Sequence, residues 1–123
     1  MRRSFSIIKT RLKYLALFAV LGSLLYGQTG ARYLVITPDY FYHTLQPLVE
    51  WKYKKGMKPA VYKLSQVGYD SVSIRNFILN CYNTWDIQPE YVILVGHPGY
   101  IPMCYYNYGG YYYYTDNYYG NMD

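Results

Sequence analysis

The sequence has few of the residues on which most catalytic and metal sites depend. It contains two cysteines and two histidines among 123 residues, and the positions of Cys81, Cys104, His43 and His97 fit no zinc-binding spacing. Glycine-rich phosphate loops are also missing, because Thr37-Pro38-Asp39 follows the first predicted strand. These absences argue against a zinc enzyme and against a nucleotide-binding enzyme.

The amino-terminal region lacks acidic residues, and its apolar run is too short to span a bilayer comfortably. Residues 1–13 hold five basic residues and no acidic one, and an apolar run follows at 14–26, before the small residues of 27–31. This order is typical of a secretory signal peptide, and the run is shorter than the roughly 20 apolar residues that span a bilayer. We therefore predict a signal peptide over residues 1–27, cleaved after Gly27 or, as second choice, after Ala31. The alternative is an uncleaved anchor helix.

The net charge of +5 comes entirely from this predicted signal peptide. From residue 28 onward seven basic residues balance seven acidic ones. A balanced chain lacks the basic surface that nucleic-acid binding requires. We expect no nucleic-acid partner, no membrane association after signal cleavage, and a location that is secreted or at the cell surface.

Three short apolar runs predict buried strands at 32–36, 59–64 and 91–95. Apolar residues at helical spacing predict helices between them, over 39–55 and 70–84. Two right-handed crossovers then give an α/β fold with an open parallel sheet of strand order 2-1-3. Three strands leave sheet edges open, so we expect further sheet from sequence that is not present here.

Specific residues mark the ends and the inner faces of these helices. Gly56 supplies a left-handed stop for the first helix, and Asp70 or Ser71 can cap the second. Because Cys81 lies within the apolar pattern of the second helix, we predict a buried free thiol, with a disulfide to Cys104 as the alternative. The predicted inner face of that helix consists of Ile74, Phe77, Ile78, Cys81 and Tyr82.

The composition changes sharply after the third predicted strand. Residues 104–123 hold nine tyrosines and almost no aliphatic residue. Such a segment cannot form a core by itself, so we predict a long irregular surface segment or a partly disordered tail. Tyrosines could stack there on sugars or peptides, and a biased surface loop without a binding role is the alternative.

Ligands of open parallel sheets bind beyond the carboxyl ends of the strands. In this chain that crevice would be lined by Thr37, Pro38, Asp39, Gly96 and His97. His97 is the most tempting catalytic residue, but no serine or cysteine at a strand end offers it a partner, so we expect its side chain either to cap its loop or to be solvated. We assign no role to His43, no catalytic residue and no cofactor site.

Oxygen ligands near the carboxyl terminus form the one candidate metal site. Asp116, Asn117 and Asp123 suit calcium in an extracellular protein, although their spacing matches no EF-hand. The residues that we name for this site are Asp116 and Asp123. Solvated loop acids are the alternative.

Several segments in order resemble one enzyme family. They are Tyr33-Leu-Val-Ile-Thr37, Leu48-Val-Glu-Trp-Lys-Tyr-Lys-Lys-Gly56, Tyr91-Val-Ile-Leu-Val-Gly96, Ile101-Pro102 and Thr115-Asp-Asn-Tyr-Tyr-Gly120. Together these segments resemble the amino-terminal part of the peptidase domain of gingipain-type (C25) cysteine peptidases. The resemblance extends from about Tyr33 to Asp123.

The resemblance implies a caspase-like α/β sheet and a secreted endopeptidase, often stabilised by calcium, that acts on protein or peptide substrates. It also implies a His-Cys dyad downstream of the matched segments, in a Gly-His-Gly turn and at the end of a later strand. His97 stands where the family usually has aspartate, and neither Cys81 nor Cys104 matches the nucleophile. The resemblance therefore implies an inactive amino-terminal piece whose partner is the remainder of the peptidase domain. A secreted, non-catalytic binding module that uses the tyrosine-rich segment is the alternative function.

Overall fold

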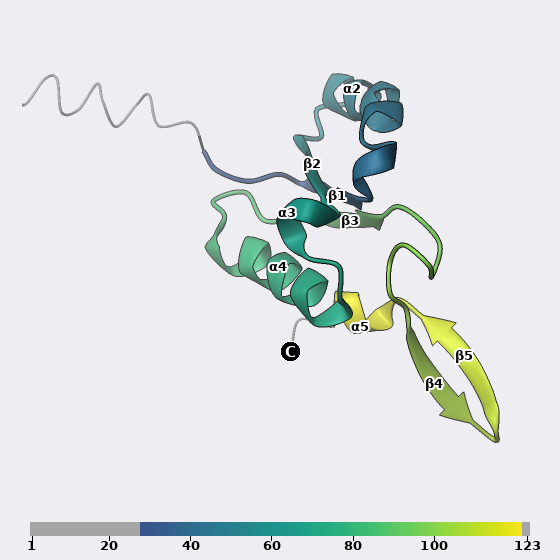
Figure 1. The fold of residues 1–123 in the computed structure, drawn as a ribbon. Coiled ribbons are helices and arrows are strands. Elements are labelled where there is room, and N and C mark those ends of the chain that lie inside the picture. Colours follow the sequence, from purple (N-terminus) through teal and green to yellow (C-terminus); the bar gives the residue numbers. More distant parts are fainter. Residues whose placement is uncertain (1–27, 122–123) are drawn as a thin grey trace, which may run out of the picture.

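The computed structural model describes residues 28–121, which form an α/β body and a protruding hairpin (Figure 1). The predicted signal peptide and Asp123 lie outside the described residues. The three parallel strands are β1 (Tyr33–Thr37), β2 (Pro59–Lys63) and β3 (Tyr91–Leu94), in the order β2-β1-β3. The predicted fold class and strand order are thus confirmed.

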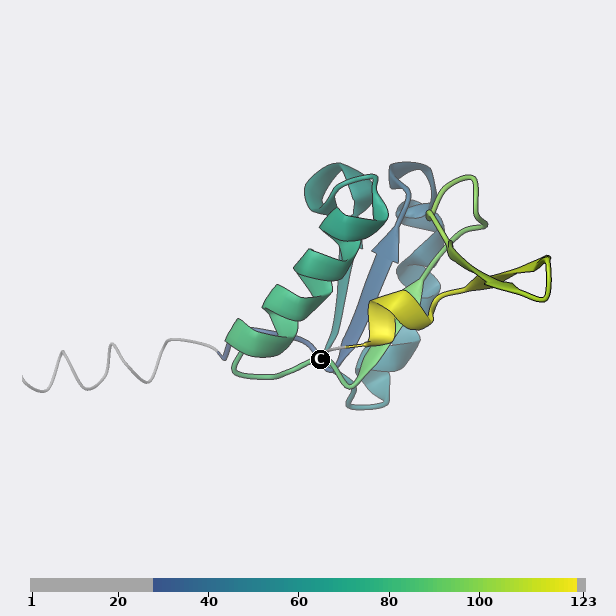
Figure 2. The ribbon, with the colours of Figure 1, turned by 90° about the horizontal axis from the view of Figure 1, so that it is seen from below.

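The central strand β1 is buried along its whole length because neighbours cover both of its edges and both of its faces. Its register pairs Val35 with Val61 of β2 and with Ile93 of β3. Helices α3 (Leu64–Val67) and α4 (Ser71–Thr84) cover one face of the sheet, and α2 (Gln46–Lys54) covers the other (Figure 2). Within the described residues, no helix is long and apolar enough to span a membrane.

The hydrophobic core lies between β1 and α4. Leu34 and Ile36 of the strand meet Ile74, Ile78 and Cys81 of the helix, all at most 1% exposed. The Asp70 side chain caps α4 by accepting a 2.9 Å hydrogen bond from the Ser73 backbone N–H, as predicted. The predicted inner face is wrong at one position, because Tyr82 is 39% exposed at the margin of the apolar stripe.

The first predicted helix is only partly α-helical. Residues Asp39–Phe41 (η1) and His43–Leu45 (η2) form two 3-10 turns, and α2 begins only at Gln46. Pro47 lies in the first turn of α2, where a residue without a backbone N–H is tolerated. The predicted stop is confirmed, since Gly56 has a φ of +75° directly after the helix.

The tyrosine-rich segment is not irregular, which corrects the prediction. Cys104–Tyr108 (β4) and Tyr111–Thr115 (β5) pair as an antiparallel hairpin, and α5 (Asn117–Gly120) follows. Gly109 and Gly110, with φ of +61° and +85°, form the two-residue turn that favours hairpins with twisted strands. Tyr119 of α5 is 3% exposed and joins the core, so this segment contributes to the body as well.

Candidate functional site

The carboxyl end of β1 is joined to the end of β2 by an aspartate–serine pair. The Asp39 carboxylate accepts hydrogen bonds from the Ser65 backbone N–H at 3.2 Å and from its hydroxyl at 2.5 Å. The bond from the Ser65 hydroxyl is the main reason that the pKa of Asp39 is lowered. The pair holds the strand ends together, and the lowered pKa makes the Asp39 carboxylate a weak base for activating the Ser65 hydroxyl.

Thr37 and Pro38 are buried beneath this connection, and the Thr37 hydroxyl donates to the Pro38 carbonyl at 3.2 Å. The crevice predicted at the strand ends is therefore lined on the β1 side by backbone and by the Asp39–Ser65 pair. It offers no free catalytic side chain there.

On the β3 side, His97 caps its own loop, as the sequence predicted. Its Nδ1 accepts a 3.0 Å hydrogen bond from the Gly99 N–H, and its backbone carbonyl accepts from the Tyr100 and Ile101 N–H groups. Its ring lies 4.7 Å from that of Tyr100, which contacts Phe41 at 5.6 Å across the crevice. These contacts fix the loop after β3 against the turn after β1.

The two cysteines lie in different environments, and neither is in a disulfide. Cys81 is 1% exposed in the core, and burial raises the pKa of its thiol to about 11. Cys104 is half-buried at the start of β4. Over residues 28–121 no hydrogen bond joins either thiol to His43 or His97. The described part of the chain therefore holds no cysteine–histidine pair of the kind that activates a thiol.

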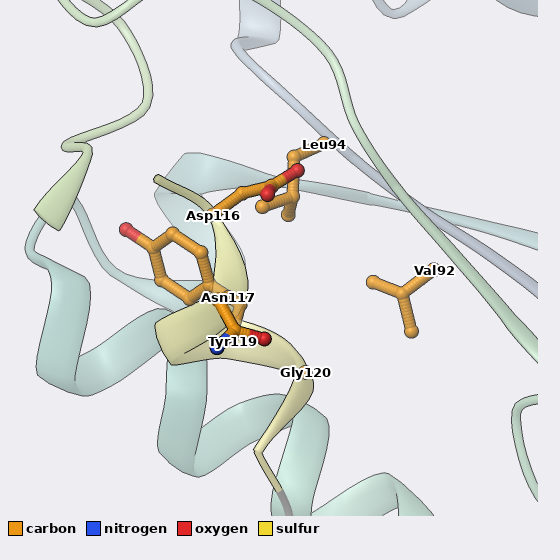
Figure 3. Close-up of a pocket in the computed structure, with 6 residues that line it drawn as sticks. All are labelled: Val92, Leu94, Asp116, Asn117, Tyr119 and Gly120. Carbon is orange, nitrogen blue, oxygen red and sulfur yellow. The ribbon is translucent and has the colours of Figure 1, made fainter. Parts of the chain in front are cut away.

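A groove lies between β3 and the segment around α5, and it consists of two adjoining hollows. The first, about 260 Å³ in volume, lies between Val92 and Leu94 of β3 and the residues of α5 with Asp116 (Figure 3). The second, about 170 Å³, shares Leu94, Asp116 and Tyr119 and reaches His97 and Met103. Through this groove the loop after β3 and the segment around α5 come together.

Tyr119 forms one wall of this groove and anchors it. Its hydroxyl donates to the Pro102 carbonyl, and burial is the main reason that the pKa of Tyr119 is raised to about 12. Sequence reasoning missed this anchoring role. Both segments that this hydrogen bond connects, Ile101-Pro102 and Tyr118-Tyr119, belong to the segments that carry the family resemblance. That shared membership is the signal that could have indicated a contact between them.

The predicted calcium ligands remain a prediction. Asp116 is exposed at the groove, its backbone carbonyl accepts a 2.9 Å hydrogen bond from the Tyr119 N–H, and Asp123 lies outside the described residues. In the described residues, no group of three or more His, Cys, Asp or Glu side chains could hold a metal ion.

Comparison with known proteins gave one match. The family model described as Peptidase family C25 matches residues 26–123. No curated protein and no solved structure matches the chain.

Proposed function

Because the chain belongs to peptidase family C25, we propose that it forms the amino-terminal part of the peptidase domain of an exported cysteine endopeptidase. The observation that carries this proposal is the open side of the sheet at β3. Within residues 28–121 that strand pairs with β1 on one edge only, and a groove lined by Val92, Leu94 and Tyr119 runs beside it. An unpaired strand edge next to a partly apolar groove is suited to receive further strands of the same domain.

The low reactivity of the Cys81 and His97 side chains supports a structural role for residues 28–121. The buried Cys81 thiol has a pKa of about 11, so it is a poor nucleophile, and the His97 imidazole is held by its own loop. The remainder of the domain would supply the His-Cys dyad, the substrate pocket and any calcium site that includes Asp116. A caspase-like arrangement of the complete sheet belongs to the same proposal.

The role of the amino terminus in export also belongs to this proposal, and the fold favours one cleavage point. The Thr29 N–H and hydroxyl donate to Asp86 at 2.9 and 2.8 Å, Gly30 bridges to Ile87, and Ala31 is fully buried. Cleavage after Ala31 would remove these contacts, whereas cleavage after Gly27 keeps them. We expect the intact mass of the exported protein to start at Gln28, and a mass that starts at Arg32 would contradict this.

A hydrolysis assay tests the catalytic part of the proposal. The purified chain is incubated with casein and with a mixed peptide library, with and without iodoacetamide. We expect no turnover that the thiol reagent abolishes. Substrate hydrolysis that iodoacetamide abolishes would overturn the proposal. The variants Cys81→Ser and Cys104→Ser would then show which thiol is responsible.

The coding sequence beyond Asp123 tests the structural part. An open reading frame that continues into a Gly-His-Gly turn and a cysteine at a strand end is the expected result. A stop codon at this point, with a matching mass of the exported protein, would overturn the peptidase assignment. It would favour the alternative of a non-catalytic binding module, which the exposed tyrosines of the hairpin support.

A further inference from the structure

The hairpin β4–β5 projects from the α/β body in both views (Figures 1 and 2). Among the elements of residues 28–121, its only extensive packing is between its own two strands. Pairing is unbroken from Cys104↔Thr115 to Tyr108↔Tyr111. An isolated two-stranded hairpin is at best marginally stable in water, so this one would gain from any surface that covers it.

The pairing register divides the tyrosines between the two faces of the hairpin. Side chains alternate along a strand, and directly opposed residues share a face. One face, which we call the tyrosine face, carries two opposed pairs that are 55–72% exposed: Tyr106↔Tyr113 and Tyr108↔Tyr111. The opposite face carries Tyr105, Tyr112 and Tyr114, together with Asn107.

The tyrosine face is large enough to form an interface. With roughly 200 Å² for each tyrosine side chain, four rings at this exposure present on the order of 500 Å². A contiguous patch of that size on a soluble domain commonly marks a contact site. If two such faces meet, they bury about 1,000 Å² in total, which is the lower limit for a specific protein interface.

The chemistry of the hairpin indicates which partner fits it. Residues 104–115 contain no charged side chain, so the face has no means of selecting an ionic partner. The Asn107 amide oxygen accepts from the Gly110 N–H at 3.2 Å within the turn, and the Thr115 hydroxyl accepts from the Asn117 N–H at 3.1 Å. Few polar side chains other than tyrosine hydroxyls are therefore free to bind a sugar.

A second copy of the same face meets these requirements. It matches in size and polarity, and neither face carries a charged side chain, so the two faces meet without charge repulsion between them. We infer that the tyrosine face is a self-association surface on which the same face of a second copy packs about a two-fold axis. This inference goes beyond the peptidase proposal, and it commits to a second copy of this chain as the occupant of the tyrosine face.

Sedimentation velocity of the full chain over a range of concentrations tests the inference. We expect a reversible monomer–dimer equilibrium in the micromolar range. Tyr106→Lys and Tyr113→Lys place charge in the tyrosine face and should raise the dissociation constant at least tenfold. The neighbours Tyr105→Lys and Tyr114→Lys are matched controls on the opposite face, with the same charge change and 66–67% exposure in the wild type, and should change it less than threefold.

Three results would overturn the inference. One is a wild-type chain that remains monomeric at every concentration. Another is an equal effect of the variants on both faces, which would indicate association through strand edges or through the apolar amino-terminal run that all variants share. The third is a monomer that binds an insoluble glucan through Tyr106 and Tyr113, which would assign the face to sugars. Unchanged far-ultraviolet circular dichroism confirms that each variant is folded.

Discussion

The α/β body and the hairpin use their apolar residues in opposite ways. In the body, the strand β1 and the inner stripe of α4 bury aliphatic side chains almost completely, and α5 adds Tyr119. In the hairpin, seven tyrosines are more than half exposed, and the strands are set by a Gly-Gly turn and by cross-strand pairs. The difference indicates that the body carries the stability of the molecule, while the hairpin leaves most of its aromatic surface exposed.

The two cysteines give the largest expected contrast, since one lies in each region. Burial raises the pKa of Cys81 to about 11 and also blocks access, whereas Cys104 is half-buried at the base of the hairpin. At pH 8 we expect Ellman's reagent to modify Cys104 of the native chain at least a hundredfold faster than Cys81. Cys104→Ser should remove the fast phase, and denaturant should expose the second thiol. Two equally fast thiols would contradict the burial of Cys81.

Truncation of one side chain in each region compares their contributions to stability. Leu34→Ala removes a fully buried side chain, so the free energy of unfolding should fall by about 3 kcal/mol. Tyr114→Ala removes an exposed ring and should change it by less than about 1 kcal/mol. Urea denaturation followed by circular dichroism measures both. A larger loss for Tyr114→Ala would show that the hairpin is part of the folding core.

Acid should lower the free energy of unfolding that the body contributes, and it should leave the contribution of the hairpin unchanged. Hydrogen bonds from Ser65 and Thr29 lower the pKa of Asp39 and Asp86 below the ordinary value of 3.8. A lowered carboxyl pKa stabilises the fold above the unfolded value, and this contribution is lost as the pH falls through the folded one. We expect the free energy of unfolding to be independent of pH near pH 6 and to decline below about pH 4.

Asp39→Asn is the variant that tests this dependence. It should flatten the decline, whereas Tyr114→Ala, in a segment without carboxyl groups, should shift stability equally at every pH. An unchanged acid profile for Asp39→Asn would show that its bonds to Ser65 do not persist in solution.

A smaller effect than that of Leu34→Ala is expected at the start of α4. Asp70 accepts from the Ser73 N–H and hydroxyl at 2.9 and 2.6 Å, so Asp70→Ala should lower the thermal midpoint, but by less than Leu34→Ala does. Asp70→Asn keeps a capping oxygen and should retain most of the stability. If both variants lose the same amount, charge rather than capping is responsible.

The body was predictable because its signals are local and periodic. Apolar runs at β1, β2 and β3 and the helical stripe of Ile74, Ile78 and Cys81 were sufficient for the strand order and for the main helix. The loop-capping role of His97 followed because the chain offers it no nucleophilic partner. The 3-10 turns before α2 were missed because the side-chain pattern does not distinguish 3-10 from α-helical turns.

The hairpin and the groove could not be predicted in the same way. A run of tyrosines lacks the apolar–polar alternation that indicates a strand, so Gly109-Gly110 was the one local signal for the hairpin. The buried place of Tyr119 and its bond to Pro102 depend on contacts between residues that are separated along the chain.

The sequence by itself determined the α/β sheet of order β2-β1-β3 and the burial of Cys81. It also predicts an exportable amino terminus, which stays a prediction. These depend on composition and on periodicities within a single strand or helix. Only the tertiary structure decided that Asp39 binds Ser65, that Tyr119 closes a groove beside β3, and that four tyrosines share one face of a hairpin. Each of these depends on strand pairing and packing between distant residues, which local patterns do not specify.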